Sequence, residues 1–366
     1  MAANTMPALA LNRVYSTTLH NQRSDVAMEI VQSNPLLWHF YRQGAVRYEG
    51  GTEVRTPVVV TESQNVSAIA PYDTFSTTPE DGPDTARYPN WYKNRCSVVL
   101  DNTEIAQNKG PQQIVNLLES KLAIAKISLI NDLSRQIWID NSANTNEIDG
   151  IYSSNNTDGF IQARTEATQA NTTGGIDRAV YANWRNRYQS ITAFGADGLD
   201  AWEQCYMDCS SRGSHPDLIV TSPTVYRFYK RLVAANQEER DKALWDQGFQ
   251  NLLFEGTPVV PDPELDGTGR TFFLTTTGKR QVNDFNLKPE YFSVPGKNPM
   301  AKGKATGVGL QLAILTSDDF RTTDFMTPPN SDVIISHTYL TCMLTASSLG
   351  RQGLVDFNAG AGTVQF

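Results

Sequence analysis

A long helical pattern dominates the middle of the sequence. Within residues 111–139 apolar side chains recur every three or four positions, at Ile114, Leu117, Leu118, Leu122, Ala125, Leu129, Leu133 and Ile137. This spacing places them on one side of an amphipathic helix. Pro111 suits the first helical position, where the N–H that proline lacks would have no intrahelical partner. At 1.5 Å per residue such a helix is roughly 43 Å long. The pattern therefore predicts a spine helix that is stabilised by packing along its length.

Two strand-like segments precede this helix and are separated by a long polar stretch. Residues 54–60 contain Pro57, which predicts an edge strand, and residues 96–100 predict a second strand. Residues 61–95 between them are polar and rich in turn residues, yet they carry Tyr72, Phe75, Tyr88, Trp91 and Tyr92. A structureless loop of this length is uncommon in a compact domain, and disordered segments are usually poor in aromatics. We interpret the stretch as an extended hairpin arm that contacts another chain; the alternative is a lid over its own domain.

After the helix, loops surround a short apolar segment at residues 148–152, and an α/β region follows. One helix is predicted to have an apolar face of Leu199, Trp202, Tyr206 and Cys209, with Gly213 as its C-cap. A second helix begins with Ser222 as N-cap and Pro223 at its first position. Strands are predicted at residues 218–221, 257–260, 271–274, 310–315 and 333–344.

Composition and charge narrow the class of protein. The 366 residues suffice for one large domain or two to three smaller ones, and only 19% are charged, below the usual figure of about 25%. A net charge of −8 argues against a protein that grips phosphate backbones. Four cysteines in a chain of this length do not indicate a disulfide framework. Residues 1–11 lack a signal-peptide pattern, and residues 333–349 are too interrupted to cross a bilayer. We expect a soluble, reduced protein that is made inside the cell.

The residues that carry chemistry form no recognisable constellation. Cys205 and Cys209 are four positions apart with His215 nearby, but a metal site would need a fourth ligand, so we interpret them as core cysteines. The nucleophile-elbow pattern G-x-S-x-G is missing from the sequence, and the glycines near Lys304 do not have phosphate-loop spacing. We therefore expect no catalytic residue, no metal site and no cofactor.

The order of the elements resembles the major capsid proteins of tailed bacteriophages. Residues 98–108 (VVLDNTEIAQN) lead into 114–118 (IVNLL), as the arm of that family leads into its spine helix. Further resemblance lies in these later stretches: 175–185 (GIDRAVYANWR), 217–223 (DLIVTSP), 254–260 (FEGTPVV), 341–345 (TCMLT) and 351–353 (RQG). The resemblance covers most of residues 40–357 and rests on the order of individually weak motifs. It implies an α+β phage major capsid fold, the shell fold of a Hong Kong lambdoid phage.

That fold implies a division of the chain into five regions. They are an N-terminal arm at 1–44, an extended loop at 45–100, the spine helix and peripheral domain at 101–194, an axial domain at 195–290, and a return to the peripheral domain with the C-terminal tail at 291–366. The five aromatic residues Tyr72, Phe75, Tyr88, Trp91 and Tyr92 are then the expected contacts between subunits. Lys93 is the one lysine of the extended loop, and we do not expect it to form a covalent crosslink to another subunit.

The resemblance also implies a function. Such a protein assembles with itself as hexamers and pentamers into an icosahedral phage head, in the host cytoplasm, and encloses double-stranded DNA without sequence-specific binding. The implied partners are a separate scaffolding protein and a portal, with decoration proteins left open, and no membrane. One alternative is an encapsulin-like shell protein that encloses cargo enzymes. Another is a soluble α/β enzyme with residues 61–95 as a lid, which would need His, Asp, Ser or Cys side chains converging on one pocket.

Overall fold

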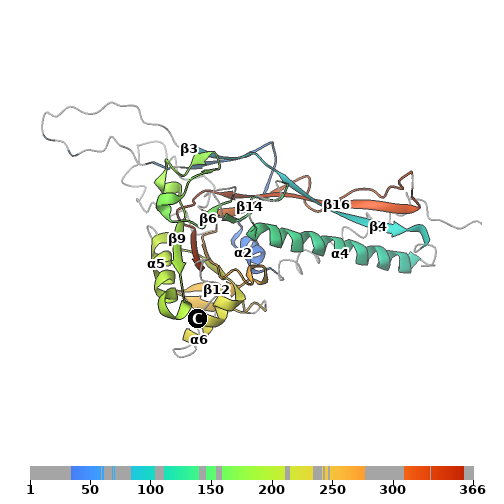
Figure 1. The fold of residues 1–366 in the computed structure, drawn as a ribbon. Coiled ribbons are helices and arrows are strands. Elements are labelled where there is room, and N and C mark those ends of the chain that lie inside the picture. The colour runs from blue at the N-terminus through green and yellow to red at the C-terminus, as the bar shows by residue number, and fades with distance from the viewer. Residues whose placement is uncertain are drawn as a thin grey trace, which may run out of the picture.

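The structure is a computed structural model of a single chain. It describes residues 34–58, 60–61, 68, 70, 84–103, 111–139, 146–153, 159–210, 215–233, 241, 244–245, 248–276, 309–329 and 331–357, with the backbone alone at 111–120. Figure 1 shows an L-shaped molecule in which helix α4 and strands β4 and β16 extend to one side of a lobe that contains α5, α6 and β12.

The predicted spine helix is confirmed as α4, Pro111–Trp138. Of the apolar positions predicted on its packed side, Leu122, Ala125, Leu129, Leu133 and Ile137 are buried. Two long strands run beside it, β4 (Tyr92–Asp101) and β16 (Val333–Ala346), which pair antiparallel from Asp101↔Val333 to Tyr92↔Cys342. A small core joins the helix to these strands: Val98, Leu100, Leu122, Ala125, Phe325 and Ile334. Because β4 begins at Tyr92, the predicted strand at 96–100 is longer than expected and takes the last residues of the predicted arm.

The sheet of β4 and β16 continues toward the lobe. Strand β16 also pairs with β14 (Leu310–Leu315) and with β15 (Arg321–Thr322), and β14 pairs in parallel with β1 (Val46–Glu49). The long strand predicted at 333–344 and the strand at 310–315 are therefore neighbours. The order of this sheet, β1-β14-β16-β15 with β4 beside β16, places residues 46–49 next to residues 310–315.

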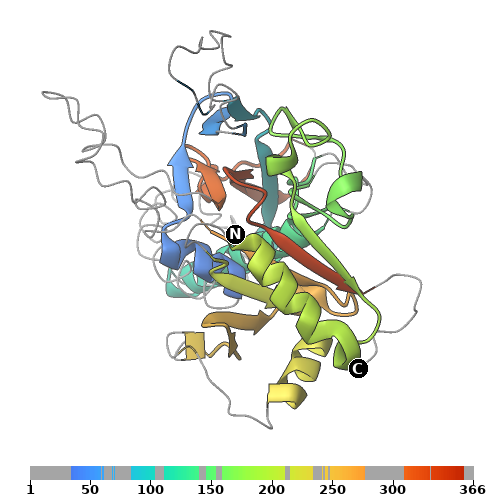
Figure 2. The same cartoon turned by 90° about the vertical axis from the view of Figure 1, so that its left-hand side faces the viewer.

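A six-stranded sheet organises the lobe, in the order β11-β12-β10-β13-β17-β9. Its strands are β9 (Arg187–Ile191), β10 (Leu218–Thr221), β11 (Leu252–Phe254), β12 (Thr257–Pro261), β13 (Thr271–Leu274) and β17 (Gly353–Phe357). Alternate side chains point to opposite faces, so Ile219 packs with α5 (Leu199–Cys209) and α6 (Pro223–Val233), whereas Leu218 and Val220 join the main core. Figure 2 shows the yellow-green helix α5 in front of this sheet.

The caps of the two lobe helices differ in how well the sequence predicts them. The N-cap of α6 is confirmed, because the Val225 N–H donates to Ser222 Oγ at 3.4 Å. The expected C-cap of α5 is wrong: the helix ends at Cys209, and Ser210 occupies the C-cap with its N–H bonded to the Tyr206 carbonyl. The chain therefore leaves the helix before Gly213 is reached.

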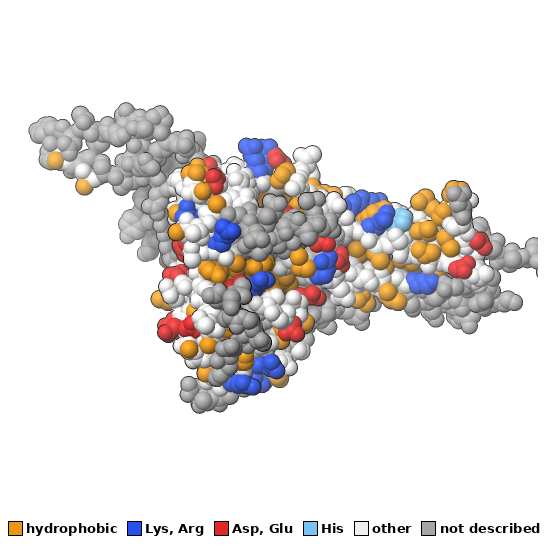
Figure 3. Space-filling view, viewed as in Figure 1, with side chains coloured by type: hydrophobic (Ala, Val, Ile, Leu, Met, Phe, Trp, Pro, Cys, Tyr) orange, Lys and Arg blue, Asp and Glu red, His pale blue; other side chains and the backbone are white. Residues whose placement is uncertain are grey.

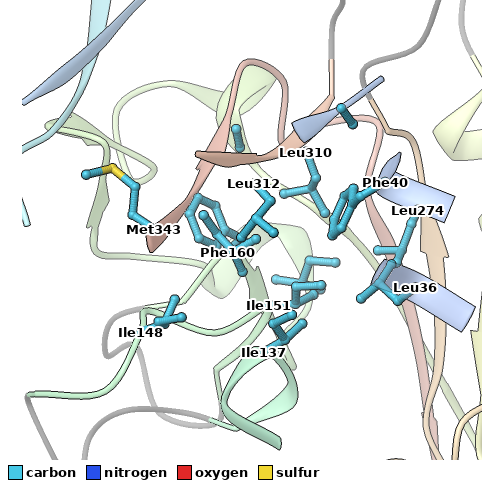
Figure 4. Close-up of a cluster of buried hydrophobic side chains, with 14 of the residues drawn as sticks. Leu36, Phe40, Ile137, Ile148, Ile151, Phe160, Leu274, Leu310, Leu312 and Met343 are labelled. Atoms are coloured by element: carbon cyan, nitrogen blue, oxygen red, sulfur yellow. The ribbon is translucent and has the colours of Figure 1, made fainter. Parts of the chain in front are cut away.

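The last part of the predicted N-terminal arm contains a helix. Helix α2 (Pro35–Gln43) is capped by Asn34, whose side chain accepts from the Leu36 and Leu37 N–H groups, and it ends at Gly44 with φ 71°. Figure 4 shows Leu36 and Phe40 in the main core, beside side chains from the end of α4 and from β14. The apolar side of α2 thus packs in the main core, and the arm at residues 1–44 stays a prediction.

The remaining elements are short. They are β2 (Val54–Val58), β3 (Asp84–Tyr88), β5 (Tyr152–Ser153), β6 (Ile161–Gln162), η2 (Glu166–Thr168), β7 (Thr172–Thr173), β8 (Ile176–Asp177), η3 (Ala182–Trp184), η4 (Phe194–Gly198) and η5 (Pro263–Leu265). The lobe sheet contains β9 and β17 from outside the predicted axial range 195–290. The division into five regions stays a prediction. In the described part of the chain, none of the helices is both long and apolar enough to cross a membrane.

Candidate assembly surfaces

A two-stranded hairpin forms the base of the predicted arm. Strand β2 pairs antiparallel with β3, with Pro57 opposite Thr85, and among the described strands neither has another partner. This confirms the edge position that Pro57 predicts. In Figure 1 the hairpin points away from the far end of β4 and β16. The tip of the hairpin, with the predicted contact residues Tyr72 and Phe75, lies outside the described residues.

The structure buries two of the predicted contact residues in their own chain. The Tyr88 hydroxyl donates to the Ala346 carbonyl at 2.7 Å and accepts from the Ala346 N–H at 3.2 Å, and burial raises the pKa of Tyr88. The Tyr92 hydroxyl donates to Asp149 Oδ1 at 2.8 Å, and its ring is also buried. Both rings therefore pack within their own chain, because β3 and β4 belong to the body of the molecule, and a role of these two residues in contacts between subunits stays a prediction.

Trp91 is the described aromatic of the arm that keeps an accessible surface. Its ring is half-buried against the main core, and its indole N–H donates to the Gly51 carbonyl at 3.1 Å. That bond joins the two ends of the arm at its base. A role of Trp91 in contacts between subunits stays a prediction.

A cleft lies directly below the hairpin. It is lined by Arg87, Tyr88, Pro89, Asn90, Tyr92, Asp149, Gly159, Phe160, Thr172, Thr173, Gly174, Gly175, Met343 and Leu344. The Arg87 N–H donates to the Gly174 carbonyl at 2.8 Å, which ties β3 to the β7–β8 turn. At Gly174 (φ 63°) an added Cβ would lie 3.1 Å from the Tyr88 ring, so this turn approaches the ring as closely as glycine allows.

The outer face of β4 and β16 carries a charged cluster around Asp318. The Asp318 carboxylate accepts from Arg321 Nε at 2.6 Å and Thr341 Oγ1 at 3.0 Å, and lies 3.3 Å from Lys93 Nζ. Lys93 and Arg321 both approach the Tyr339 ring, at 4.3 and 5.2 Å from its centroid. Burial favours the neutral carboxyl, but the hydrogen bonds outweigh it and lower the pKa of Asp318. Lys93 therefore has a carboxylate partner within its own chain.

The same face becomes apolar toward its far end. Val99 and Met326 are exposed, and Met326 exchanges two backbone hydrogen bonds with Ile335, at 2.9 and 2.8 Å. Figure 3 shows hydrophobic side chains gathered at this end of the molecule, next to Lys, Arg and His side chains. An apolar area beside a basic one suits contact with another protein.

Strand β4 also has an open edge among the described strands. Ile335 bonds to Met326 on the side away from β4, so its partner Val99 points its own N–H and C=O to the outer edge of β4. Lys121 Nζ, from α4, donates to the Val99 carbonyl at 3.2 Å there. An edge of this kind is a template for pairing with an extended segment.

Cys205 and Cys209 lie in the core between α5 and β17. A Cβ added at Gly353 would lie 2.5 Å from Cys205 Sγ and 2.7 Å from Cys209 Sγ, so strand and helix are in contact there. Burial raises the pKa of the Cys205 thiol. His215 stacks on Tyr206. Within the described residues no three His, Cys, Asp or Glu side chains converge as metal ligands would.

No protein-family model and no curated protein matches the chain. Among solved structures, the capsid asymmetric unit of cyanophage A-1(L) superposes with a TM-score of 0.54 over 86% of this chain and 90% of that one. The fold is that of a phage capsid protein. The two chains are 14% identical, so the likeness concerns the fold, and the predicted α+β capsid fold is confirmed.

Two other solved structures are similar at lower scores. The capsid of Myoviridae phage XM1 has a TM-score of 0.48 and 14% identity over 87% of this chain and 91% of that one. The SrpI encapsulin of Synechococcus elongatus PCC 7942 has a TM-score of 0.46 and 12% identity over 85% and 84%.

The sequence did not reveal the cluster around Asp318. Lys93 belongs to the predicted arm and Asp318 to a turn, and only the pairing of β4 with β16 brings them together. The clue in the sequence was a period of two from Tyr92 to Asp101, which extends the predicted strand back to Tyr92.

Proposed function

We propose that this protein is the major capsid protein of a tailed phage, assembling as hexamers and pentamers into an icosahedral shell around double-stranded DNA. The observation that carries the proposal is the capsid fold, which extends over most of the chain with the spine helix and hairpin base in place.

The surfaces of the chain support assembly with other copies. The hairpin projects from the body, and the outer end of β4 and β16 exposes Val99 and Met326. Extended contacts of this kind bury more apolar area the longer they are. Each Å² of buried apolar surface stabilises the contact by about 25 cal/mol. Because the same contacts recur throughout a closed shell, a modest stabilisation per subunit is enough to hold the shell together.

The partners of the shell follow from the same proposal. A separate scaffolding protein would guide assembly, and a portal would occupy one vertex. The net charge of −8 suits DNA that is enclosed without being bound in sequence-specific fashion. A strongly basic inner surface of the assembled shell would contradict that last point.

Electron microscopy of the purified chain, with its mass by light scattering, tests the proposal. Closed shells, or rings of five and six subunits, are expected, alone or with the candidate scaffold. A chain that stays monomeric or dimeric with the scaffold present would overturn it.

The contents of the particles separate a phage head from an encapsulin-like shell. Particles from infected cells should contain double-stranded DNA, measured by absorbance and by nuclease digestion after disruption. Particles filled with a cargo enzyme and devoid of DNA would favour the encapsulin alternative. The enzyme alternative predicts turnover of a substrate by the free chain.

A further inference from the structure

One side of the spine helix is exposed although it carries no charge. Ile124 is 62% exposed and Ile127 is 40% exposed, and Asn131 is exposed as well. At 100° per residue these three positions lie within about 60° of one another. We call this side of α4 the uncovered stripe. A helix that is apolar on more than one side is normally covered by other protein.

The lysines of this part of α4 lie off the uncovered stripe. Lys121 points to β4, where it donates to the Val99 carbonyl at 3.2 Å. Lys126 is 2% exposed and belongs to the buried side. The nearest cation further along this side, Arg135, is paired with Asp132 at 2.9 Å and Glu147 at 3.0 Å. The stripe itself therefore offers isoleucines to whatever lies over it.

Further along the same side, α4 is already covered. Trp138 is buried against the lobe, with its indole N–H donating to Asp262 Oδ2 at 3.0 Å. One helical turn earlier Ser134 is buried, and its hydroxyl accepts from Asn34 Nδ2 at 2.7 Å. The cover thus ends at Asn34, and the uncovered stripe begins directly beyond it at Asn131.

Asn34 is also the point at which the described chain begins. It is fixed from both sides, because its Oδ1 caps α2 and its Nδ2 binds Ser134. Ser134 and Ile124 are ten positions apart, which is roughly 15 Å along the helix. Ten residues before Asn34 suffice to reach that far, even at one helical rise each of about 1.5 Å.

The sequence directly before Asn34 contains apolar residues that could pack on the stripe. Val26, Ala27, Ile30 and Val31 recur at the spacing of one helical side, after Ser24 and Asp25. Residues 24–33 lie outside the described residues. We propose that residues 24–33 of the same chain cover the uncovered stripe of α4, with these apolar side chains against Ile124 and Ile127.

Disulfide trapping in the full, unassembled chain tests the contact. The pair Val26→Cys with Ile127→Cys should form an intrachain disulfide under mild oxidation at least tenfold faster than the control pair Val26→Cys with Met207→Cys. Met207 is a fair control because it is 66% exposed, on α5. The single variant Val26→Cys corrects for reaction with the native Cys96, which is partly exposed.

Two outcomes of the trapping would overturn the proposal. Equal rates for both pairs would show that residue 26 has no preferred place. Disulfide-linked dimers would show that the segment of a second copy covers the stripe.

A stability measurement provides an independent test with a defined sign. Glutamine is a better helix former than isoleucine, so on an uncovered surface Ile124→Gln leaves the thermal midpoint unchanged or raises it. If residues 24–33 cover the stripe, the midpoint falls by about 2 °C or more, and the fall is smaller in an Ile30→Gln background.

Met207→Gln is the matched control and should not lower the midpoint. An unchanged midpoint for Ile124→Gln, or the same fall in both backgrounds, would contradict the proposal. Both tests use the unassembled chain, so their result does not depend on whether the protein forms a shell.

Discussion

Arg178 is a fully buried cation whose hydrogen bonds join several loops. Its Nη2 donates to the Gly159 and Phe160 carbonyls at 3.0 and 2.8 Å, Nη1 to Asn186 Oδ1 at 3.1 Å, and Nε to Thr173 Oγ1 at 3.1 Å. These acceptors are neutral, and burial lowers the pKa of Arg178 to about 10. The planar guanidinium provides donors in fixed directions, so one side chain holds together a region with little regular structure.

Removal of this guanidinium should be costly. Arg178→Met leaves several buried acceptors without a donor, and we expect the free energy of unfolding to fall by about 3–5 kcal/mol. Chemical denaturation of the unassembled chain measures it. Arg87→Met is the control, since Arg87 is exposed on β3, and should change stability by about 0.5 kcal/mol or less. Similar values for the two variants would refute the structural role of Arg178.

Asp318 provides a prediction about pH. Its pKa is lowered in the folded chain by hydrogen bonds from Arg321, Thr341 and Lys93, so the folded state binds this proton less tightly than the unfolded state. The stabilisation is present above the unfolded pKa of about 3.9 and is lost as pH falls through the lower folded pKa. Asp318→Asn should be less stable than the parent at pH 7, with the difference shrinking below about pH 4. A difference that is constant with pH, or equal to that of Asp319→Asn, would contradict this assignment.

At the scale of elements, the junction of α4 with the lobe determines how the spine is held. Trp138, in the last turn of α4, packs on Phe272 of β13 at 5.0 Å between ring centroids and donates to Asp262 Oδ2 at 3.0 Å. Asp262 is buried and caps η5, where it accepts from the Glu264 N–H at 3.0 Å. Burial raises the pKa of Asp262, and the bonds from Glu264 and Trp138 limit the rise.

Trp138→Phe tests this junction. The smaller ring leaves space and removes the donor to a buried carboxylate, so we expect a loss of about 2–4 kcal/mol at pH 7. The pKa of Asp262 should rise further, which favours the protonated folded state at lower pH. The loss should therefore be smaller near pH 4 than at pH 7. Trp245→Phe, at an exposed indole, should change stability little, and equal losses would argue against the junction.

At the scale of the whole molecule, the extensions point in opposite directions from one body. The hairpin base and the far end of β4 and β16 lie at opposite ends of the view in Figure 1. Extensions that point away from the body favour contacts between copies of the chain. The half-buried Trp91 lies where the hairpin meets the body, bonded to the Gly51 carbonyl.

Trp91→Ala should separate assembly from folding. We expect the yield of shells, counted by electron microscopy, to fall severalfold while the unfolding midpoint of the free chain changes little. Tyr92→Ala is the contrasting variant, because it removes a buried ring and should cost the free chain about 3–5 kcal/mol. Equal loss of assembly and of chain stability in Trp91→Ala would count against a contact between subunits.

The sequence by itself determined the elements whose pattern is local. The spine helix, the edge strand with Pro57, the strand at 218–221 and the Ser222 cap follow from periodicity and from the chemistry of single residues. Their order was enough to indicate the capsid fold, which the cyanophage capsid structure confirms.

Only the tertiary structure decided what depends on partners distant in the sequence. It buried Tyr88 and Tyr92, placed β17 in the lobe sheet, and brought Lys93 to Asp318. The physical reason is that the burial of a side chain depends on the strand or helix opposite it, and a local pattern contains no information about that neighbour. The same holds for the uncovered stripe of α4, whose exposure is visible only once everything else has packed.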